Sequence, residues 1–188
     1  SDIIQTGDGN NATVIQTGTG GSDHVSGITQ TGNGNIASVN QSGLVDTSTI
    51  TQVNSGGPNT ASVTQSGGAT NTSDILQNGT GAANSATVLQ GGGAGTQTSN
   101  IDQDGSGNSA SVTQTAAGGT SLSNIFQTGN GHSATVNQSG SLSDTSTITQ
   151  TDLGGPNWAS VTQSGASTNS SDVTQTGTGA TNFATVLQ

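Results

Sequence analysis

One residue type, glutamine, sets the framework of this chain. Of its 17 Gln residues, 16 fall on one regular lattice and only Gln97 lies off it. Taken alternately, the lattice residues divide the chain into eight repeats, and the second Gln recurs every 24 or 25 residues, a spacing typical of solenoids and other arrays. The lattice residues are Gln5, Gln16, Gln30, Gln41, Gln52, Gln65, Gln77, Gln90, Gln103, Gln114, Gln127, Gln138, Gln150, Gln163, Gln175 and Gln188.

Alignment on these Gln residues places other residue types in fixed columns. The residue four before the first Gln of a repeat is always Ser, and the residue two before it is Ile or, once, Val. The residue four before the second Gln is always Ala, and the residue two before it is always Val. The residue six before the second Gln is Asn in seven repeats, whereas His132 takes this place in the sixth. These Asn residues are Asn10, Asn35, Asn59, Asn84, Asn108, Asn157 and Asn182.

Fixed and variable positions alternate along each repeat, which is the period of a β-strand with one buried face. We expect a strand with Ser, Ile and Gln inward, a Gly-rich turn, a strand with Asn, Ala, Val and Gln inward, and another turn. Side-by-side hairpins would show the same period without requiring the same residue in every repeat. Stacking does require it, because equivalent amides then lie about 4.8 Å apart and form hydrogen-bonded ladders. The prediction is an all-β fold, a two-sheet β-solenoid of cross-β, amyloid-like type with eight rungs.

A longer periodicity covers the whole chain. The tract from Gln30 to Gln90 recurs from Gln127 to Gln188, and Gly-Gly-Pro-Asn occurs at 56–59 and again at 154–157. We interpret residues 1–188 as a single array with an internal duplication, 1–90 and 99–188, joined by a Gly-rich seam over 91–98. Two separate domains are the alternative, but the Gln spacing crosses the seam without a break.

Composition limits what such an array can do. The net charge is −10 with no Lys or Arg, so the chain offers no basic patch for nucleic acid or an anionic membrane surface. No apolar run approaches the ~18 residues of a membrane span, and the absence of Cys excludes thiol chemistry. We expect no enzyme activity, cofactor or metal, because no Ser or His has suitable partners. The lack of an initial Met and a signal peptide is expected of a mature chain or an excised part of one.

Few residues suggest a site of another kind. We expect His24 to lie in a connecting loop next to Asp23, and His132 to take the place of a ladder Asn, both in structural roles. Trp158 and Phe183 are expected on an outward face. A sugar-stacking site is one hypothesis, but singly exposed aromatics are more often incidental, or contacts between neighbouring fibres.

The columns resemble the curlin repeat, Ser-x5-Gln-x-Gly-x-Gly-Asn-x-Ala-x3-Gln. The part from the first Gln to the last is matched in full over 5–16, 30–41 and 103–114, and over 127–138 with His132 in place of Asn. The other four repeats carry two extra turn residues, and the leading Ser at this spacing occurs only at Ser121. The resemblance covers the whole chain and identifies it as a divergent curlin-like array with eight repeats.

Curlins are secreted bacterial subunits that polymerise into amyloid fibres of the biofilm matrix. The resemblance implies a structural subunit that adds head-to-tail to an extracellular, cell-surface fibre. It implies copies of the chain itself as the main partner, with a nucleator subunit and secretion chaperones as further partners, and it assigns polymerisation to the Gln and Asn columns. Two other hypotheses are the solenoid stalk of a cell-surface adhesin and an ice-binding β-solenoid. Ice binding fits less well, because the Thr-x-Thr pairs at 49–51 and 147–149 are not repeated on most other rungs.

Two expectations concern assembly. The low apolar content, 26%, leaves an isolated chain little to offset a backbone entropy of about 1–2 kcal/mol per residue, so we expect a largely disordered monomer that orders on a fibre end. Acidic residues, taken to face outward, avoid one another: Asp2 and Asp172 share a column from the first and last rungs, and Asp46 and Asp144 share another. Head-to-tail addition would place Asp172 over Asp2 at the subunit junction, which predicts faster assembly in mild acid.

Overall fold

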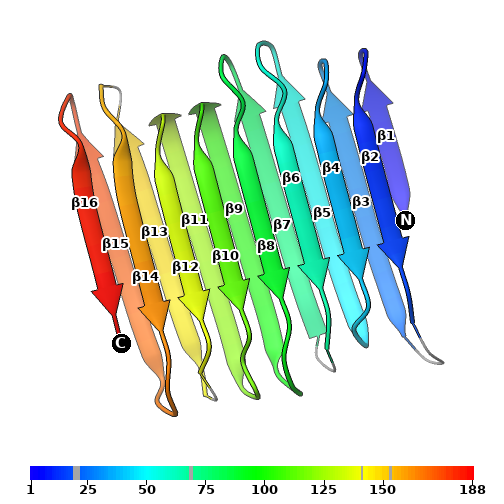
Figure 1. Ribbon diagram of the computed structural model, residues 1–188, viewed down its shortest axis with the longest axis vertical. Coiled ribbons are helices and arrows are strands. Elements are labelled where there is room, and N and C mark those ends of the chain that lie inside the picture. The colour runs from blue at the N-terminus through cyan, green and yellow to red at the C-terminus, as the bar shows by residue number, and fades with distance from the viewer. Residues whose placement is uncertain (19–21, 68–69, 141, 153) are drawn as a thin grey trace.

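The predicted two-sheet β-solenoid is confirmed. The computed structural model describes residues 1–18, 22–67, 70–140, 142–152 and 154–188, and within them every regular element is a strand. The odd-numbered strands form one eight-stranded sheet in the order β1-β3-β5-β7-β9-β11-β13-β15, and the even-numbered strands form a second in the order β2-β4-β6-β8-β10-β12-β14-β16. Each rung contributes one strand to each sheet, so the two termini lie at opposite ends of the stack (Figure 1).

The strands of the two sheets differ in length. The odd-numbered strands are β1 (Asp2–Thr6), β3 (Asp23–Thr31), β5 (Val45–Asn54), β7 (Thr70–Gly79), β9 (Thr96–Ser106), β11 (Thr120–Asn130), β13 (Asp144–Asp152) and β15 (Asn169–Gly177). The even-numbered strands are β2 (Asn11–Gln16), β4 (Ile36–Gln41), β6 (Thr60–Gln65), β8 (Ser85–Gln90), β10 (Ser109–Gln114), β12 (Ser133–Gln138), β14 (Asn157–Gln163) and β16 (Asn182–Leu187). From β3 onward the odd strands begin before the Ser column, which adds positions that the repeat alignment did not include.

All neighbouring strands are parallel and in the register that the columns require. Ile50, for example, pairs with Ile28 on one side and Ile75 on the other, and Val112 pairs with Val88 and Val136. The apolar columns of the two sheets meet in the middle and form one continuous core, in which the Ile and Val side chains of the inner rungs are at most 1% exposed. The core is narrow, and polar columns border it on both sides.

Glycines shape the turns of the four rungs that match the curlin pattern. In each of these turns both glycines of Gln-x-Gly-x-Gly have positive φ, a conformation that residues with a Cβ rarely adopt. A Cβ on the first of them in the second rung, Gly32, would overlap Asn54 of the rung above. The Gly-x-Gly spacing is therefore needed both for the turn conformation and for the close approach of successive turns. The eight residues are Gly7, Gly9, Gly32, Gly34, Gly105, Gly107, Gly129 and Gly131.

The extended odd strands correct three sequence-based interpretations. His24 lies in β3 and not in a loop, and its partner is Asp46, not Asp23. Asp46 and Asp144 are fully buried and do not face outward. Gln97, off the lattice, is also buried, because it belongs to the same inward column. This column lies six residues before the first Gln, an even offset that returns it to the inner face; it comprises His24, Asp46, Asn71, Gln97, Ser121, Asp144 and Asn169.

Candidate functional site

The lattice Gln residues form two continuous hydrogen-bonded ladders along the solenoid. In the odd sheet, each Nε2 from Gln5 onward donates to Oε1 of the next rung, at 2.7–2.9 Å, as far as Gln175. In the even sheet, the same chain of bonds runs from Gln16 to Gln188 at 2.8–3.0 Å. All sixteen predicted Gln positions therefore lie in the ladders.

Each interior Gln also ties the two sheets together. Nε2 of Gln30 donates to the backbone carbonyl of Asn11 at 3.0 Å, and Nε2 of Gln41 donates to that of Val25 at 3.0 Å, in each case across to the opposite sheet. A buried amide thus accepts one bond along the axis, donates one along the axis and donates one across. Because a buried amide without partners costs about 1–3 kcal/mol, this threefold pairing explains how so polar an interior is tolerated.

The Asn column works differently from the Gln ladders. Oδ1 of Asn35 accepts from the backbone N–H of Asn59 at 3.0 Å, while Nδ2 of Asn35 donates to the carbonyl of Thr31 at 3.1 Å. Four Asn residues of this column, Asn10, Asn35, Asn59 and Asn108, make both bonds and so link the turn of their own rung to the next rung. Oδ1 of five of the seven predicted Asn residues accepts the backbone N–H of the next rung in this way: Asn10, Asn35, Asn59, Asn84 and Asn108. Oδ1 of Asn157 accepts instead from Nδ2 of Asn182, at 2.8 Å.

His132 reproduces these bonds with an imidazole. Its Nδ1 accepts from the backbone N–H of Asn157 at 3.1 Å, and its Nε2 lies 3.1 Å from the carbonyl of Thr128. An N–H and a carbonyl on opposite sides require a neutral ring with the proton on Nε2. The predicted replacement of a ladder Asn is thus confirmed in its geometry.

The two end faces of the array are complementary in hydrogen-bonding polarity. At the first rung, Oε1 of Gln5 and of Gln16 accept no hydrogen bond from any described residue. At the last rung, Nε2 of Gln175 and of Gln188 donate across to the opposite sheet, at 3.1 Å in both cases, but not along the axis. One end thus presents acceptors and the other presents donors, at the same two columns.

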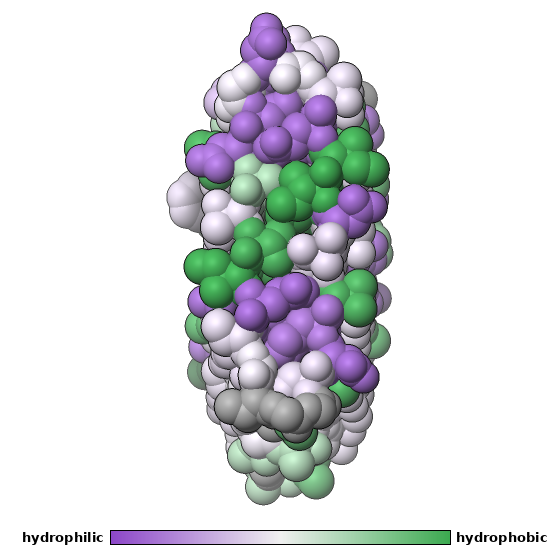
Figure 2. Space-filling view, turned by 90° about the vertical axis from the view of Figure 1, so that its right-hand side faces the viewer, coloured by the Kyte–Doolittle hydropathy of each residue, from purple (hydrophilic) through white to green (hydrophobic). Residues whose placement is uncertain are grey.

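The apolar columns are uncovered at the first rung. Ile3 is 43% exposed, whereas Ile28, the next residue of its column, is 1% exposed. Figure 2 views the molecule from this side and shows apolar surface between two hydrophilic bands. Among the described residues, the first rung therefore exposes side chains of columns that are buried in the inner rungs. Burial of such a surface is favourable in proportion to the apolar area removed from water.

The structure places Asp2 and Asp172 in one column at opposite ends. Asp2 pairs with Gly27 in the second rung, and Asp172 pairs with Thr147 in the seventh. Within one chain these two carboxylates do not meet, and both are exposed. They would become neighbours only where the last rung of one copy met the first rung of another in continuous register.

Other outward carboxylates lie closer together in the middle of the odd sheet. Partial burial raises the pKa of Asp74 above its usual 3.8. Partial burial also raises the pKa of Asp102, and the nearby carboxylates of Asp104 and Asp74 raise it further. These shifts reflect the cost of charge on a sheet face that has no cation to offset it.

Repeat alignment missed a buried polar cluster around Asp46. Its Oδ1 accepts from Nδ2 of Asn71 at 2.8 Å, its Oδ2 accepts from the backbone N–H of Gly43 at 2.6 Å, and Nδ1 of His24 lies 3.4 Å from Oδ2. The column holds different residue types, so identity along the repeats gives no signal. Counting back from the first Gln in steps of two residues, past the Ser column, would have predicted that this position faces inward.

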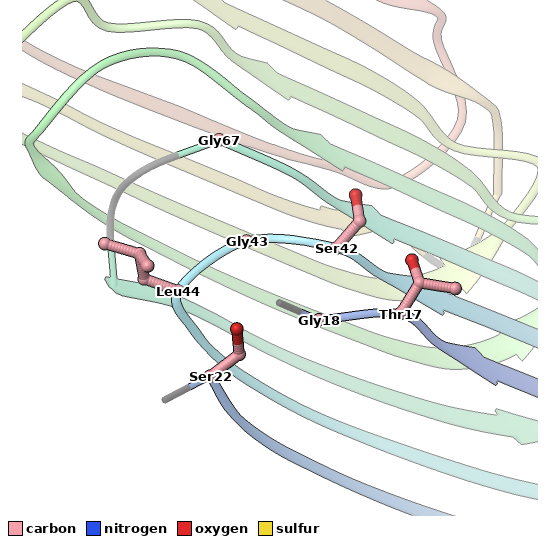
Figure 3. Close-up of a pocket in the computed structure, with 7 residues that line it drawn as sticks. All are labelled: Thr17, Gly18, Ser22, Ser42, Gly43, Leu44 and Gly67. Carbon is pink, nitrogen blue, oxygen red and sulfur yellow. The ribbon is translucent and has the colours of Figure 1, made fainter. Parts of the chain in front are cut away.

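A surface hollow adjoins this cluster at the turns of the first rungs. Hydroxyl groups of Thr17 and Ser42 point to the same side of it in Figure 3. Its lining residues are Thr17, Gly18, Ser22, Ser42, Gly43, Leu44 and Gly67. In the described part of the chain, no three His, Cys, Asp or Glu residues come close enough together to hold a metal ion.

Comparisons with protein-family models, curated proteins and solved structures found no match for this chain. Among the described residues there is also no helix long and apolar enough to cross a membrane.

Proposed function

We propose that this chain is a structural subunit that polymerises head-to-tail into an extracellular functional amyloid fibre of a biofilm matrix or cell surface, as its resemblance to the curlin repeat implies. The chain itself is then the main partner, with a nucleator and secretion chaperones as further partners. In this proposal the protein is secreted, and its product is the fibre and not a reaction.

The observation that carries the proposal is the match between the two ends. The last rung presents amide donors at Gln175 and Gln188, and the first rung presents amide acceptors at Gln5 and Gln16. Both rungs follow the same columns as the interior, so a junction between copies would repeat the contacts of an internal rung pair. Open parallel sheet edges of this kind template further strands.

Electron microscopy of the purified chain tests the proposal, with unbranched fibres as the expected result. The variant Gln175→Leu/Gln188→Leu should slow fibre growth, because each substitution removes a donor at the growing end. The control Thr174→Val/Thr185→Val alters neighbouring outward positions and should grow at the wild-type rate. Equal thioflavin growth rates for the two variants would show that the ladders do not drive addition.

The junction itself makes a separate prediction. Stacking the last rung on the first brings Asp172 over Asp2 at about 4.8 Å, and no Lys or Arg is present to offset the two charges. Wild-type growth should therefore accelerate as the pH falls toward 4, and Asp172→Asn should remove most of this dependence. If the Asn variant keeps the full pH dependence at fixed ionic strength, net charge and not the junction controls assembly.

A further inference from the structure

The two outer faces of the solenoid differ in charge. The outward positions of the odd sheet carry six carboxylates, whereas the strands of the even sheet contain no charged residue at all. The acidic residues of the odd sheet's outer face are Asp2, Asp23, Asp74, Asp102, Asp104 and Asp172. In a chain of net charge −10, one face is thus anionic and the other, which we call the even face, is neutral.

The even face has a regular composition. Its middle column, three residues before the second Gln, is Ser or Thr in every rung: Thr13, Ser38, Ser62, Thr87, Ser111, Thr135, Ser160 and Thr185. Large apolar side chains flank this row near both ends. Ile15 and Ile36 are 50% and 46% exposed in the first two rungs, and Trp158, Phe183 and Leu187 are 52%, 74% and 78% exposed in the last two.

We propose that the even face packs against the even face of a second copy, so that two filaments associate laterally; this rests on the proposed fibre function. Eight rungs at about 4.8 Å and six-residue strands at about 3.3 Å per residue give a face of roughly 38 by 20 Å. That is close to the ~800 Å² per partner of a typical stable interface, and it would continue along a filament. The anionic face is a poor alternative, because its carboxylates would meet like charges without any cation.

The apolar positions favour antiparallel filaments. If the two copies run in opposite directions, the first rung of one faces the last rung of the other and each column faces itself. Ile36 then lies opposite Trp158, and Ile15 lies opposite Leu187. Parallel filaments would instead place Ile36 opposite Asn40 and Trp158 opposite Thr162. They would keep only one kind of apolar match, Phe183 opposite Leu187, whereas antiparallel filaments have two. In both arrangements the hydroxyl row faces its own equivalent, and small side chains there permit close approach of the sheets.

Trp158 and Phe183 are then the centre of the apolar contact. Their ring centroids lie 5.8 Å apart with the planes inclined by 48°, so the two rings already form one platform on a single copy. Together with Ser133, Thr135 and Thr185 they line a shallow hollow on the even face. An isoleucine from the partner would fill this hollow and remove Trp158, the chain's single Trp, from water.

A matched pair of charge insertions tests the proposal. Thr64→Asp/Thr162→Asp places two carboxylates on the even face, and Thr51→Asp/Thr149→Asp places two at the equivalent column and rungs of the odd face. All four Thr residues are partly exposed, and both variants add the same net charge. We expect wild type and the odd-face control to form paired filaments with blue-shifted Trp158 emission. The even-face variant should form single filaments with unshifted emission and an unchanged elongation rate.

The outcomes separate this inference from the fibre proposal. Single wild-type filaments, or pairs that survive in the even-face variant, would overturn lateral pairing while the fibre function stands. If no fibre forms, sedimentation of the soluble chain decides: a dimer lost only in the even-face variant supports pairing alone, and a wild-type monomer overturns both proposals. Single wild-type filaments that bind insoluble β-glucan through Trp158 would assign the even face to a neutral sugar and overturn pairing.

Discussion

The two halves of the duplicated chain bury a carboxylate at the same place with different partners. Asp46 in the third rung and Asp144 in the seventh each accept bonds from a glycine N–H and an Asn amide, at 2.6 and 2.8 Å for Asp46 and at 3.2 and 2.9 Å for Asp144. In the rung below, the first half supplies His24, whose Nδ1 lies 3.4 Å from Oδ2 of Asp46, whereas the second half supplies Ser121. Among the described residues, neither the imidazole nitrogens of His24 nor the hydroxyl of Ser121 has a hydrogen-bond partner.

A second difference lies at the opposite end of the same two strands, β5 and β13. In the first half, Nδ2 of Asn54 donates to Oδ1 of Asn35 at 2.7 Å. The equivalents in the second half are Asp152 and His132, and there the buried Oδ2 of Asp152 has no hydrogen-bond partner among the described residues. The comparison teaches that backbone register tolerates substitutions in the polar columns, while satisfaction of each buried group depends on which residues occupy adjacent rungs.

The largest loss of stability is expected from substitutions in the Gly-x-Gly turns, which occur in both halves. Gly32→Ala and Gly129→Ala each put a Cβ at positive φ and into the backbone of the rung above, and each should cost about 3 kcal/mol or more. Because the isolated chain is expected to be largely disordered, the guanidinium midpoint for loss of the β-sheet signal of preformed fibres measures this effect. Gly27→Ala is the control, because its Cβ meets nothing within 4 Å. An equally large loss at Gly27 would mean that the turns are not the constraint.

Exchange of the column residues tests the difference between the halves directly. His24→Ser gives the first half the environment of the second, and it should destabilise the fold by about 1–3 kcal/mol, because Asp46 keeps two donors but loses the imidazole whose Nδ1 lies 3.4 Å from its Oδ2. Ser121→His should have the opposite sign, since it offers Asp144 the same partner. Denaturant midpoints of the two variants measure both effects. Changes of the same sign would contradict the comparison.

Asp102 provides a pH-dependent contrast, because its counterpart in the first half is the uncharged Ile4. Burial and neighbouring carboxylates raise the pKa of Asp102 above 3.8 in the folded state. The unfolded chain therefore ionises first, so the folded state loses stability as pH rises from 3.8 through the raised pKa, and the loss is complete above it. Asp102→Asn should stabilise the fold at neutral pH and change nothing below pH 3.8. The exposed turn variant Asp8→Asn, with the same change in net charge, should show a smaller gain; an equal gain would point to net charge.

The smallest effect is expected at the buried Ser column. The hydroxyls of Ser48 and Ser146, at equivalent positions in the two halves, are buried and have no hydrogen-bond partner in the part of the chain that the structure describes. Ser48→Ala and Ser146→Ala each remove an unsatisfied polar group and almost no volume, so each should leave stability unchanged within about 0.5 kcal/mol or raise it slightly. Thermal or denaturant midpoints measure the effect. A clear loss of stability in either variant would contradict the prediction and show that these hydroxyls stabilise the fold.

Much of the candidate site was predictable because its residues repeat. The sixteen Gln, the Ile and Val columns and the place of His132 follow from identity at a fixed spacing, and the two sheets follow from period two. The cluster of His24, Asp46 and Asn71 was not found, since three different residue types in three rungs give no repeat. The bonds of the Asn column to backbone N–H groups, and of Gln across the sheets, depend on side-chain directions that spacing does not specify.

The sequence by itself determined the register, because only one alignment of the rungs superimposes every Gln, Ile and Val, and a slip of one residue would turn the whole set outward. Tertiary structure alone decided how each polar group is satisfied. A donor and an acceptor meet only when strands from two rungs and two sheets are brought together, and at about 4.8 Å between rungs one changed side chain alters the partners of its neighbours above and below. The same assembly gathers the acidic residues on one face and leaves the other neutral, a segregation that becomes visible once every strand is assigned to its sheet.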